Sequence, residues 1–412
     1  MIGKYFSHGR SLAAVGLLAL GGCLSGTNTS FTPPSAGAKV RAELNSPYQV
    51  LYSFRGRHGA SPYAAPINVA GTLYGTTSHG GTYDAGMFYK ITPSGKEVVL
   101  RSFFGVRGAL PLANLIEVKG TLYGTTELGG TGAGCSGSRC GTVFSITTSG
   151  VEHVLHNFSG PDGAEPLAPL LDVNGIFYGT TIAGGASDLG TVFSLTRSGK
   201  ETVLHSFSGG SDGAHPRAGL IEVNNKLYGT SQDGGANSCG GFGCGTVYAI
   251  TTSGKETVLH SFSGSDGSSP TGNFAEIKGA LYSTTDSGGA NCGGSGGCGT
   301  VFRITTSGKE TVIHSFSGAD GAFPYAGLIS VKGILYGTTV NGGGGGSACD
   351  YAGCGTIFSI MTSGKETVLH SFGNYGDGIN PFAGLLNGNG MIYGTTPYAG
   401  VRGFGTAFSL KY

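Results

Sequence analysis

Short apolar segments separated by glycine-rich stretches recur along most of this chain, and each recurrence keeps the same order of hydrophobic and polar positions. These segments are rich in Val, Ile, Tyr, Phe and Thr with partial alternation of period two, which is typical of half-buried strands. No segment beyond the N-terminus has a convincing helical period. In one representative unit, the four segments are residues 218–223, 226–231, 245–250 and 256–262.

The second segment of each unit carries the motif Leu-Tyr-Gly-Thr-Thr or a one-residue variant of it. Repeats of about 40 to 50 residues with several short strands are typical of propellers. The last unit has only three segments before Tyr412, and segment 48–54 matches the missing fourth one. We therefore predict an all-β fold, a seven-bladed β-propeller with four antiparallel strands per blade, closed by the N-terminal strand (48–54) completing the last blade. The seven motif tyrosines are Tyr74, Tyr123, Tyr178, Tyr228, Tyr282, Tyr336 and Tyr393.

The connections within a unit differ in length. The third and fourth segments are joined by a short turn with a Ser-Gly pair, and glycine supplies the positive φ that a tight hairpin requires. The first and second segments are joined by an equally short turn. The other two connections are longer and vary, so we expect them to share the opposite face, where ligands usually bind. The turn glycines include Gly95, Gly150, Gly199, Gly308 and Gly364.

The N-terminus has the features of an export signal. Lys4 and Arg10 precede an apolar run over residues 11–20, and small residues follow. Leu20-Gly21-Gly22-Cys23 resembles the cleavage box of bacterial lipoproteins, which implies a lipidated Cys23; a signal peptide without lipidation is the alternative. We expect a signal peptide over 1–22, a lipidated cysteine and flexible tether over 23–47, and the propeller over 48–412. The predicted location is the bacterial cell envelope, periplasmic or surface-exposed and membrane-anchored.

The other eight cysteines form four close pairs, each between the second and third segments of a unit. The intervals between motif tyrosines are 49, 55, 50, 54, 54 and 57 residues, and the four long ones contain the pairs. For an exported chain this pattern predicts four local disulfides that hold glycine-rich loops on the long-loop face. A zinc site would require reduced thiolates and converging pairs. The pairs are Cys135 and Cys140, Cys239 and Cys244, Cys292 and Cys298, and Cys349 and Cys354.

A histidine recurs in the fourth segment of five units, with Tyr52 and Arg101 in two others. Equivalent residues on outer strands of different blades lie far apart, and alternation places His205 on the side of Val203 and Phe207. We therefore expect packing or surface roles, no metal site and no cofactor. An Asp-Gly step before most units supplies one carboxylate per loop, too few for calcium, and predicts a turn. The histidines are His156, His205, His260, His314 and His370.

Two groups of residues are candidates for function at the channel mouth on the long-loop face. Glu165, His215 and Arg217 flank the prolines that open adjacent units and are the candidate catalytic group, although a chance polar cluster is the alternative. Exposed aromatic rings suit contact with a sugar or protein, unless they plug the channel as core. The candidate binding residues are Tyr63, Tyr83, Phe323, Tyr325, Tyr351, Phe382 and Tyr398.

Composition narrows the function classes. Lys and Arg number 24 against 23 Asp and Glu, which leaves a formal net charge of +1. A basic footprint for nucleic acid is therefore absent. The chain has no tryptophan, which weakens a lectin interpretation without excluding it. We expect a monomer that contacts the membrane only through its lipid.

The repeat pattern resembles the GloVer-type tandem repeat of exported, surface-anchored bacterial proteins. The resemblance covers residues 48–412, and residues 227–262 and 335–372 match nearly throughout, while Met87-Phe88-Tyr89 and Arg101 depart from the pattern. It implies an anchored extracellular propeller and carries no assigned activity. The residues favour a binding module for a glycan, an envelope component or a protein. The alternative is an extracellular hydrolase or lyase acting on sugar or lactone substrates at the central channel mouth.

Overall fold

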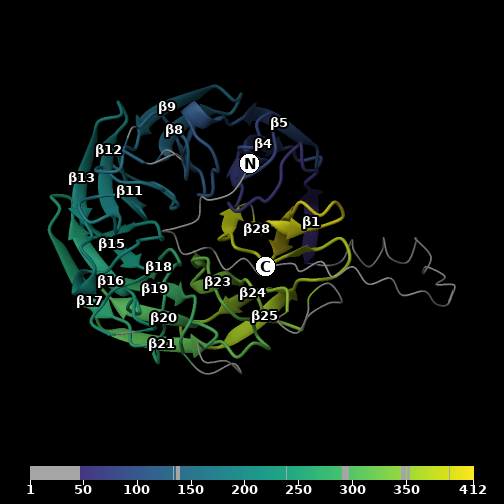
Figure 1. Ribbon diagram of the computed structural model, residues 1–412. Helices are drawn as coiled ribbons and strands as arrows, with labels where there is room; N and C mark the ends of the chain where they lie inside the picture. The colour runs from purple at the N-terminus through teal and green to yellow at the C-terminus, as the bar shows by residue number, and fades with distance from the viewer. Residues whose placement is uncertain are drawn as a thin grey trace, which may run out of the picture. The chain divides into compact units, whose positions relative to one another are not determined.

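The computed structural model describes residues 47–412 except 133, 136–139, 238, 290–296, 345–348, 350–352 and 389. Residues 47–412 form one compact unit. Within this unit, seven four-stranded antiparallel sheets follow one another around a ring, as predicted (Figure 1). The predicted signal peptide, Cys23 and all of the predicted tether but its last residue lie outside the described residues. In the part of the chain that is described, no helix has the length and apolar character to cross a membrane.

In blades 1 to 6 the strands follow in chain order from the centre of the ring to its rim. Blade 1 consists of β2 (Ile67–Val69), β3 (Thr72–Thr77), β4 (Met87–Ile91) and β5 (Glu97–Ser102). Blade 2 consists of β6 (Ile116–Val118), β7 (Thr121–Thr126), β8 (Thr142–Thr147) and β9 (Glu152–Asn157). Blade 3 consists of β10 (Leu171–Val173), β11 (Ile176–Thr181), β12 (Thr191–Thr196) and β13 (Glu201–Ser206). Blade 4 consists of β14 (Ile221–Val223), β15 (Lys226–Ser231), β16 (Thr246–Thr251) and β17 (Glu256–Ser261).

The remaining blades repeat this order, with small additions. Blade 5 consists of β18 (Ala275–Ile277), β19 (Ala280–Thr285), β20 (Thr300–Thr305) and β21 (Glu310–Ser315). Blade 6 consists of β22 (Ile329–Val331), β23 (Ile334–Thr339), β24 (Thr356–Ile360) and β25 (Glu366–Ser371). Blade 7 consists of β27 (Leu386–Gly388), β28 (Met391–Thr396), β30 (Thr406–Lys411) and β1 (Tyr48–Ser53). Short additions are the turns η1 (Gly105–Arg107) and η2 (Gly210–Asp212) and the pair β26 (Gly378–Ile379) and β29 (Tyr398–Ala399).

The N-terminal strand closes the ring. β1 pairs antiparallel with β30, with Tyr48 opposite Leu410 and Val50 opposite Phe408. The fourth strand of blade 7 therefore comes from the opposite end of the chain from the other three, as the sequence predicts. Closure leaves no blade with a missing outer strand, so the two termini hold each other in a single sheet.

The innermost strands are shorter than predicted. The sequence pattern suggested a strand over 218–223, but β14 spans only Ile221–Val223. The preceding backbone groups bond to neighbouring blades instead, since the Ala218 carbonyl accepts Thr180 Oγ1 at 3.1 Å and the Gly219 N–H donates to Asn273 Oδ1 at 2.6 Å. These groups are therefore unavailable to a strand partner, and they tie three blades together near the axis.

The repeated motif has a structural role at each of its positions, as blade 4 illustrates. Gly229 faces the ring of Tyr248, and a Cβ at this glycine would lie 2.6 Å from the tyrosine Cζ. Thr230 donates its hydroxyl to the Pro270 carbonyl of the next blade at 3.1 Å. Ser231, in the place of the second threonine, bonds to Thr246 of the third strand at 2.8 Å. The motif thus fixes both the packing within a blade and the contact between blades.

The histidines face the other side of the sheet from the one predicted, because the fourth strand contains a bulge. In blade 3, His205 lies opposite Val192 while Val203 lies opposite Phe193, because the register shifts between these pairs. Cross-strand partners share a face, so His205 and Val203 point to opposite sides rather than the same one. His205 still packs edge-on against Phe207, with ring centroids 4.9 Å apart.

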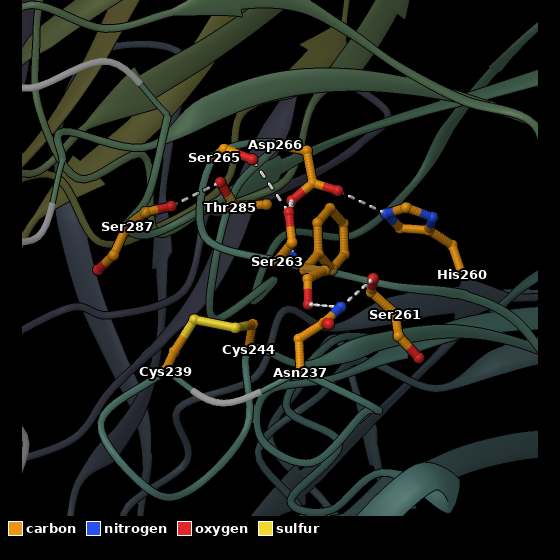
Figure 2. The surroundings of a disulfide bond; sticks show 11 residues. Asn237, Cys239, Cys244, His260, Ser261, Ser263, Ser265, Asp266, Thr285 and Ser287 are labelled. Atoms are coloured by element: carbon orange, nitrogen blue, oxygen red, sulfur yellow. Dashed lines mark hydrogen bonds and ion pairs between the residues drawn. A yellow bond between two sulfur atoms is a disulfide. The ribbon is translucent and has the colours of Figure 1, made fainter.

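The described cysteines confirm the local disulfides. Cys135–Cys140, Cys239–Cys244 and Cys349–Cys354 are bonded, with Cα–Cα distances of 5.5, 5.0 and 5.5 Å. Cys298 is also disulfide-bonded, and its predicted partner Cys292 lies outside the described residues. In Figure 2 the Cys239–Cys244 bridge lies beside Asn237, whose amide donates to the Ser261 carbonyl at 3.3 Å. The disulfide loop therefore braces the end of the fourth strand.

Candidate functional site

A ring of strained residues surrounds the channel mouth on the long-loop face. The residue before each blade-opening proline has a left-handed φ of 54 to 57°, although none of the seven is glycine. Backbone bonds hold this conformation: the Glu165 N–H donates to the Cys140 carbonyl at 2.9 Å, and the Glu165 carbonyl accepts the Ile182 N–H at 3.2 Å. Such strain persists where the surroundings over-determine it, often at functional sites. The seven residues are Ser61, Leu110, Glu165, His215, Ser269, Phe323 and Asn380.

Arg217 reaches across this ring. It follows the opening proline of blade 4, and its Nη1 donates to the Tyr325 hydroxyl of blade 6 at 2.6 Å. Thr271 of the intervening blade 5 donates its hydroxyl to the Tyr325 carbonyl at 2.9 Å. The Arg217 Nε is buried and has no hydrogen-bond partner among the described residues. The guanidinium therefore keeps an unused donor inside the protein while the contacts of Arg217, Thr271 and Tyr325 join three blades.

Three half-buried carboxyl groups lie in the field of this arginine. Burial and the nearby Glu165 raise the pKa of Glu127 to about 7, against an opposing effect of Arg217. Burial raises the pKa of Asp286 to about 6, opposed by a hydrogen bond from Ser287 and by Arg217. Burial also raises the pKa of Glu165, which Arg217 and His215 lower. One fixed cation thus faces three carboxyl groups, and two of these titrate near neutral pH.

The structure places the predicted catalytic group in one electrostatic neighbourhood. The charges of both Arg217 and His215 lower the pKa of Glu165 against the effect of burial. The His215 ring, however, is bonded through Nδ1 to the carboxylate of Asp233 at 2.9 Å. This pair uses part of the hydrogen-bonding capacity of His215. Of the three predicted residues, Glu165 and Arg217 are the ones whose charges affect the pKa of Glu127, and Arg217 also affects that of Asp286.

Sequence reasoning missed Glu127 and Asp286. Both occupy the position directly after the Leu-Tyr-Gly-Thr-Thr motif, and their N–H groups donate to the ring residues Leu110 and Ser269 at 3.0 Å. The signal was present in the repeat, because all five other units carry an uncharged residue at this position. That position becomes informative only when its pairing with the ring residues is known. The seven residues are Ser78, Glu127, Ile182, Gln232, Asp286, Val340 and Pro397.

Four of the predicted aromatic residues form one cluster at the mouth. The Tyr63 ring lies 5.6 Å from that of Phe382 and 6.2 Å from that of Tyr398, and the two tyrosine hydroxyls are 2.5 Å apart. The Phe382 ring also lies 5.5 Å from that of Tyr325, the partner of Arg217. The cluster therefore continues the arc that begins at Arg217, from blade 4 through blades 6 and 7 to blade 1.

The other three predicted aromatic residues are not placed in this cluster. Tyr83 is 66% exposed and its ring packs 5.7 Å from that of Phe104. Phe323 is 37% exposed and is one of the seven residues that precede a blade-opening proline. Tyr351 lies outside the described residues. The candidate binding surface therefore centres on Tyr63, Phe382 and Tyr398.

The recurring histidines have polar partners that the sequence reading did not foresee. In blade 4, His260 Nε2 lies 3.0 Å from Asp266 Oδ2, and its ring packs edge-on against Phe262 at 4.9 Å. Asp266 also accepts the Ser263 N–H at 2.7 Å, which agrees with the predicted turn. The aspartate of the Asp-Gly step thus both closes its turn and binds the histidine.

A cleft of about 620 Å³ lies on the opposite, short-turn face between blades 5 and 6. Its lining includes the cationic side chains Lys278, Arg303 and Lys332. None of its lining residues is a carboxylate or belongs to the channel mouth. This cleft is therefore separate from the cluster around Arg217.

The protein is therefore a seven-bladed propeller, and its candidate site at the channel mouth consists of Arg217, three carboxyl groups and a cluster of aromatic side chains. The Gloeobacter/Verrucomicrobia repeat matches residues 13–243, 133–349 and 291–412, so the chain belongs to this repeat family. This confirms the resemblance identified from the repeat pattern. A comparison with curated proteins found no match.

Several solved propellers share this fold at low sequence identity. Virginiamycin B lyase from Staphylococcus aureus is 15% identical over 89% of this chain and 100% of its own, with a TM-score of 0.57. A streptogramin B lyase is 14% identical over 88% of this chain and 97% of its own, with a TM-score of 0.58. A europium-containing methanol dehydrogenase is 11% identical over 89% of this chain and 94% of its own, with a TM-score of 0.54. At these identities the likeness establishes the fold alone.

Proposed function

We propose that the protein is an extracytoplasmic binding module and that its channel mouth takes a neutral, hydroxyl-rich ligand, a glycan of the cell envelope. The observation that carries this proposal is the arc from Arg217 through Tyr325 to the aromatic cluster. An arginine with unused donors, carboxyl groups that accept hydrogen bonds, and tyrosine rings with polar edges match the alternating polar and apolar faces of a sugar.

Charge argues for a neutral ligand over an anionic one. Arg217 is the cation that acts on all three carboxyl groups, Glu127, Glu165 and Asp286. With the carboxyl groups even partly ionised, the mouth carries no excess of positive charge. An added anion would meet repulsion from these groups, whereas sugar hydroxyls would donate to them.

The location of the protein supports an envelope ligand. Disulfides persist in oxidising compartments, which places the chain outside the cytoplasm. We further propose that a lipid on Cys23 holds it at the membrane. Metabolic labelling with a fatty acid tests this anchor, since label should enter the wild type and not the Cys23→Ala variant; equal labelling of both would exclude it.

A glycan array tests the binding proposal. The purified full-length chain should bind one or more neutral oligosaccharides, and Tyr398→Ala should weaken that binding because it removes a rim ring of the cluster. Tyr375→Ala is the matched control, since this tyrosine is 95% exposed and lies in a loop outside the cluster. Absence of any glycan signal, or equal loss in both variants, would contradict the proposal.

A hydrolase or lyase is the second candidate function. The specific observation in its favour is that Glu127 and Asp286 have pKa values raised to about 7 and about 6, in the range that suits general acid and base groups. Two propellers of similar fold are lyases, but this likeness does not assign their substrates to this chain. Cleavage of an array ligand that stops in Glu127→Gln and Asp286→Asn would support this function, and cleavage unchanged in both would exclude these residues.

A further inference from the structure

The blades of the ring meet along seams at which two fourth strands approach each other. The first residue of a fourth strand faces the histidine position of the preceding blade, and in six blades this residue is glutamate. In four seams the glutamate joins the His–Asp pair of the preceding blade. The four groups are His156, Asp162 and Glu201; His205, Asp212 and Glu256; His260, Asp266 and Glu310; and His314, Asp320 and Glu366.

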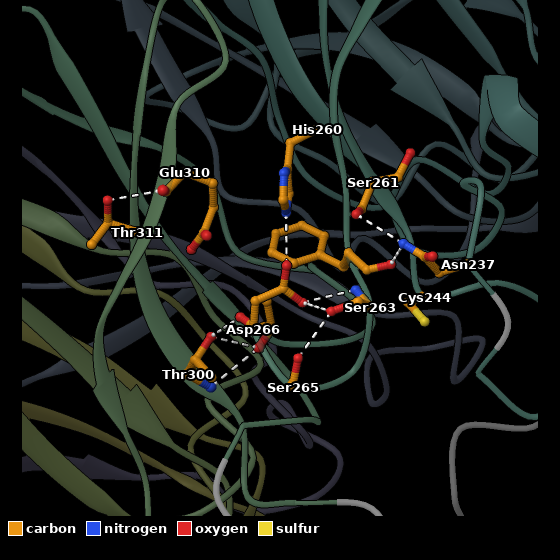
Figure 3. Close-up of polar contacts among 12 residues, drawn as sticks. Asn237, Cys244, His260, Ser261, Ser263, Ser265, Asp266, Thr300, Glu310 and Thr311 are labelled. Atoms are coloured by element: carbon orange, nitrogen blue, oxygen red, sulfur yellow. Dashed lines mark hydrogen bonds and ion pairs between the residues drawn. The ribbon is translucent and has the colours of Figure 1, made fainter.

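The seam between blades 4 and 5 has the geometry of a three-ligand site. One ligand atom from each of His260, Asp266 and Glu310 lies within 4.8 Å of the other two. Figure 3 shows His260 pointing at Asp266, with Glu310 approaching from the neighbouring blade. The second oxygen of Asp266 accepts the N–H and the hydroxyl of Ser263, at 2.7 and 2.9 Å. These bonds and the contact with Phe262 orient the carboxylate and the imidazole, as supporting residues do around bound metals.

In the other three seams a donor of the protein lies beside a carboxylate, in two of them at the position of the histidine. Arg101 forms an ion pair with the buried Glu152 at 3.0 Å, and the Tyr52 hydroxyl donates to Glu97 at 3.3 Å. Where the fourth strand begins with Tyr48 instead of glutamate, its hydroxyl donates to Asp377 at 2.5 Å. At each of these seams the chain supplies a cation or a hydrogen-bond donor to the carboxylate.

Among the described residues, the glutamates of the four His–Asp–Glu seams have no such donor. The Oε1 atoms of these glutamates are buried and have no hydrogen-bond partner among the described residues. A buried carboxylate oxygen without a partner is costly, so a recurring one needs an explanation. Glu97 Oε1 and Glu152 Oε1 are unpaired as well, so the unpaired oxygen recurs in six seams, and what distinguishes these four is that a histidine and an aspartate of the preceding blade lie beside it. The four glutamates are Glu201, Glu256, Glu310 and Glu366.

We propose that each of these four seams binds one divalent cation of the zinc class, coordinated by the histidine Nε2 and by the aspartate and glutamate carboxylates. An imidazole with two carboxylates suits Zn²⁺ better than Ca²⁺, which prefers oxygen ligands throughout. The histidine and aspartate belong to one blade and the glutamate to the next, so each ion clamps two blades. The sequence expectation of no metal considered only that the histidines lie far from one another, and it did not foresee these carboxylates.

Zinc stoichiometry of the tag-free, full-length chain tests this proposal. After dialysis against Zn²⁺ and removal of free metal, elemental analysis should find four ions per chain. Glu310→Gln keeps the size of the side chain but removes a ligand, so this variant should bind three. The variant with all four glutamates changed to Gln should bind none. His370→Gln is the matched control, because Tyr48 replaces glutamate in its seam, and it should still bind four.

A second measurement separates metal loss from unfolding. EDTA should lower the Tm of the zinc-loaded wild type and leave the Tm of the four-glutamate variant unchanged, because only bound metal stabilises the folded state by mass action. A wild type that binds less than one ion per chain would overturn the proposal. A folded Glu310→Gln chain that still binds four ions, or a His370→Gln chain that loses one, would overturn it as well.

Discussion

The disulfide between Cys135 and Cys140 lies in the loop of blade 2 whose backbone holds Glu165, one of the carboxyl groups at the channel mouth. Cys140 is buried, and its carbonyl accepts the N–H of Glu165 in blade 3 at 2.9 Å. The variant C135A/C140A removes the cross-link while it leaves the strands of both blades intact. We expect a modest loss of global stability and a larger local loosening at Glu165.

The magnitude follows from the length of the closed loop. The cysteines are five residues apart, and the chain-entropy relation assigns about 2 kcal/mol to so short a loop. For a unit of this size the entropy of unfolding is roughly 0.8 kcal/mol per kelvin, so the Tm should fall by about 3 °C. Blade 3 forms the same four strands without a cysteine pair, which is consistent with a small effect.

Calorimetry and amide hydrogen exchange measure the two effects separately. C239A/C244A is the matched control, because it has the same cysteine spacing and its Cys244 carbonyl holds Ser269 instead of Glu165. Both variants should lose a similar Tm, but only C135A/C140A should speed exchange at the Glu165 amide. A Tm loss above about 10 °C would refute the entropy argument. Equal exchange at the Glu165 amide in both variants would refute the claim that the Cys135–Cys140 loop holds this residue in place.

Two further predictions concern packing and protonation. Gly229→Ala should cost about 1–3 kcal/mol, because the new Cβ would lie 2.6 Å from the Tyr248 Cζ; Gly105→Ala, whose Cβ would meet nothing within 4 Å, should stay within about 0.5 kcal/mol of the wild type. Equal denaturation midpoints for the two variants would refute this. Because the pKa of Glu127 is raised from 4.5 to about 7, the folded state favours its protonated form, and stability is lost as pH rises through 7. Glu127→Gln should therefore gain stability relative to the wild type between pH 5 and 8 in urea titrations, and a difference independent of pH would contradict the shift.

The repeat pattern predicted the blades well and their inner edge less well. The second strand, β15, spans Lys226–Ser231 as expected, because the motif determines its packing on both sides. The innermost strand was predicted too long, since a single unit does not reveal that its backbone bonds to neighbouring blades. The bulge before His205 was equally invisible, because it is set by pairing with β12 and not by the polarity of the residues.

The candidate site was predicted in part. Glu165 and Arg217 were found because they flank the prolines that open their blades. Asp286 was missed because its neighbours at the mouth come from other blades and from a different position of the repeat. Glu310 was missed for the same reason, since it meets His260 only where two blades pack. A repeat alignment compares equivalent positions, whereas these contacts join positions that are not equivalent.

The affinity of Arg217→Lys for the glycan identified on the array tests the central claim most directly. Lysine keeps the positive charge but lacks the planar, forked donors of the guanidinium, one of which reaches Tyr325. Loss of a hydrogen bond to a charged group costs about 1.5–3 kcal/mol, so the account predicts affinity at least about tenfold weaker than that of the wild type. Affinity equal to that of the wild type would contradict a ligand site centred on Arg217.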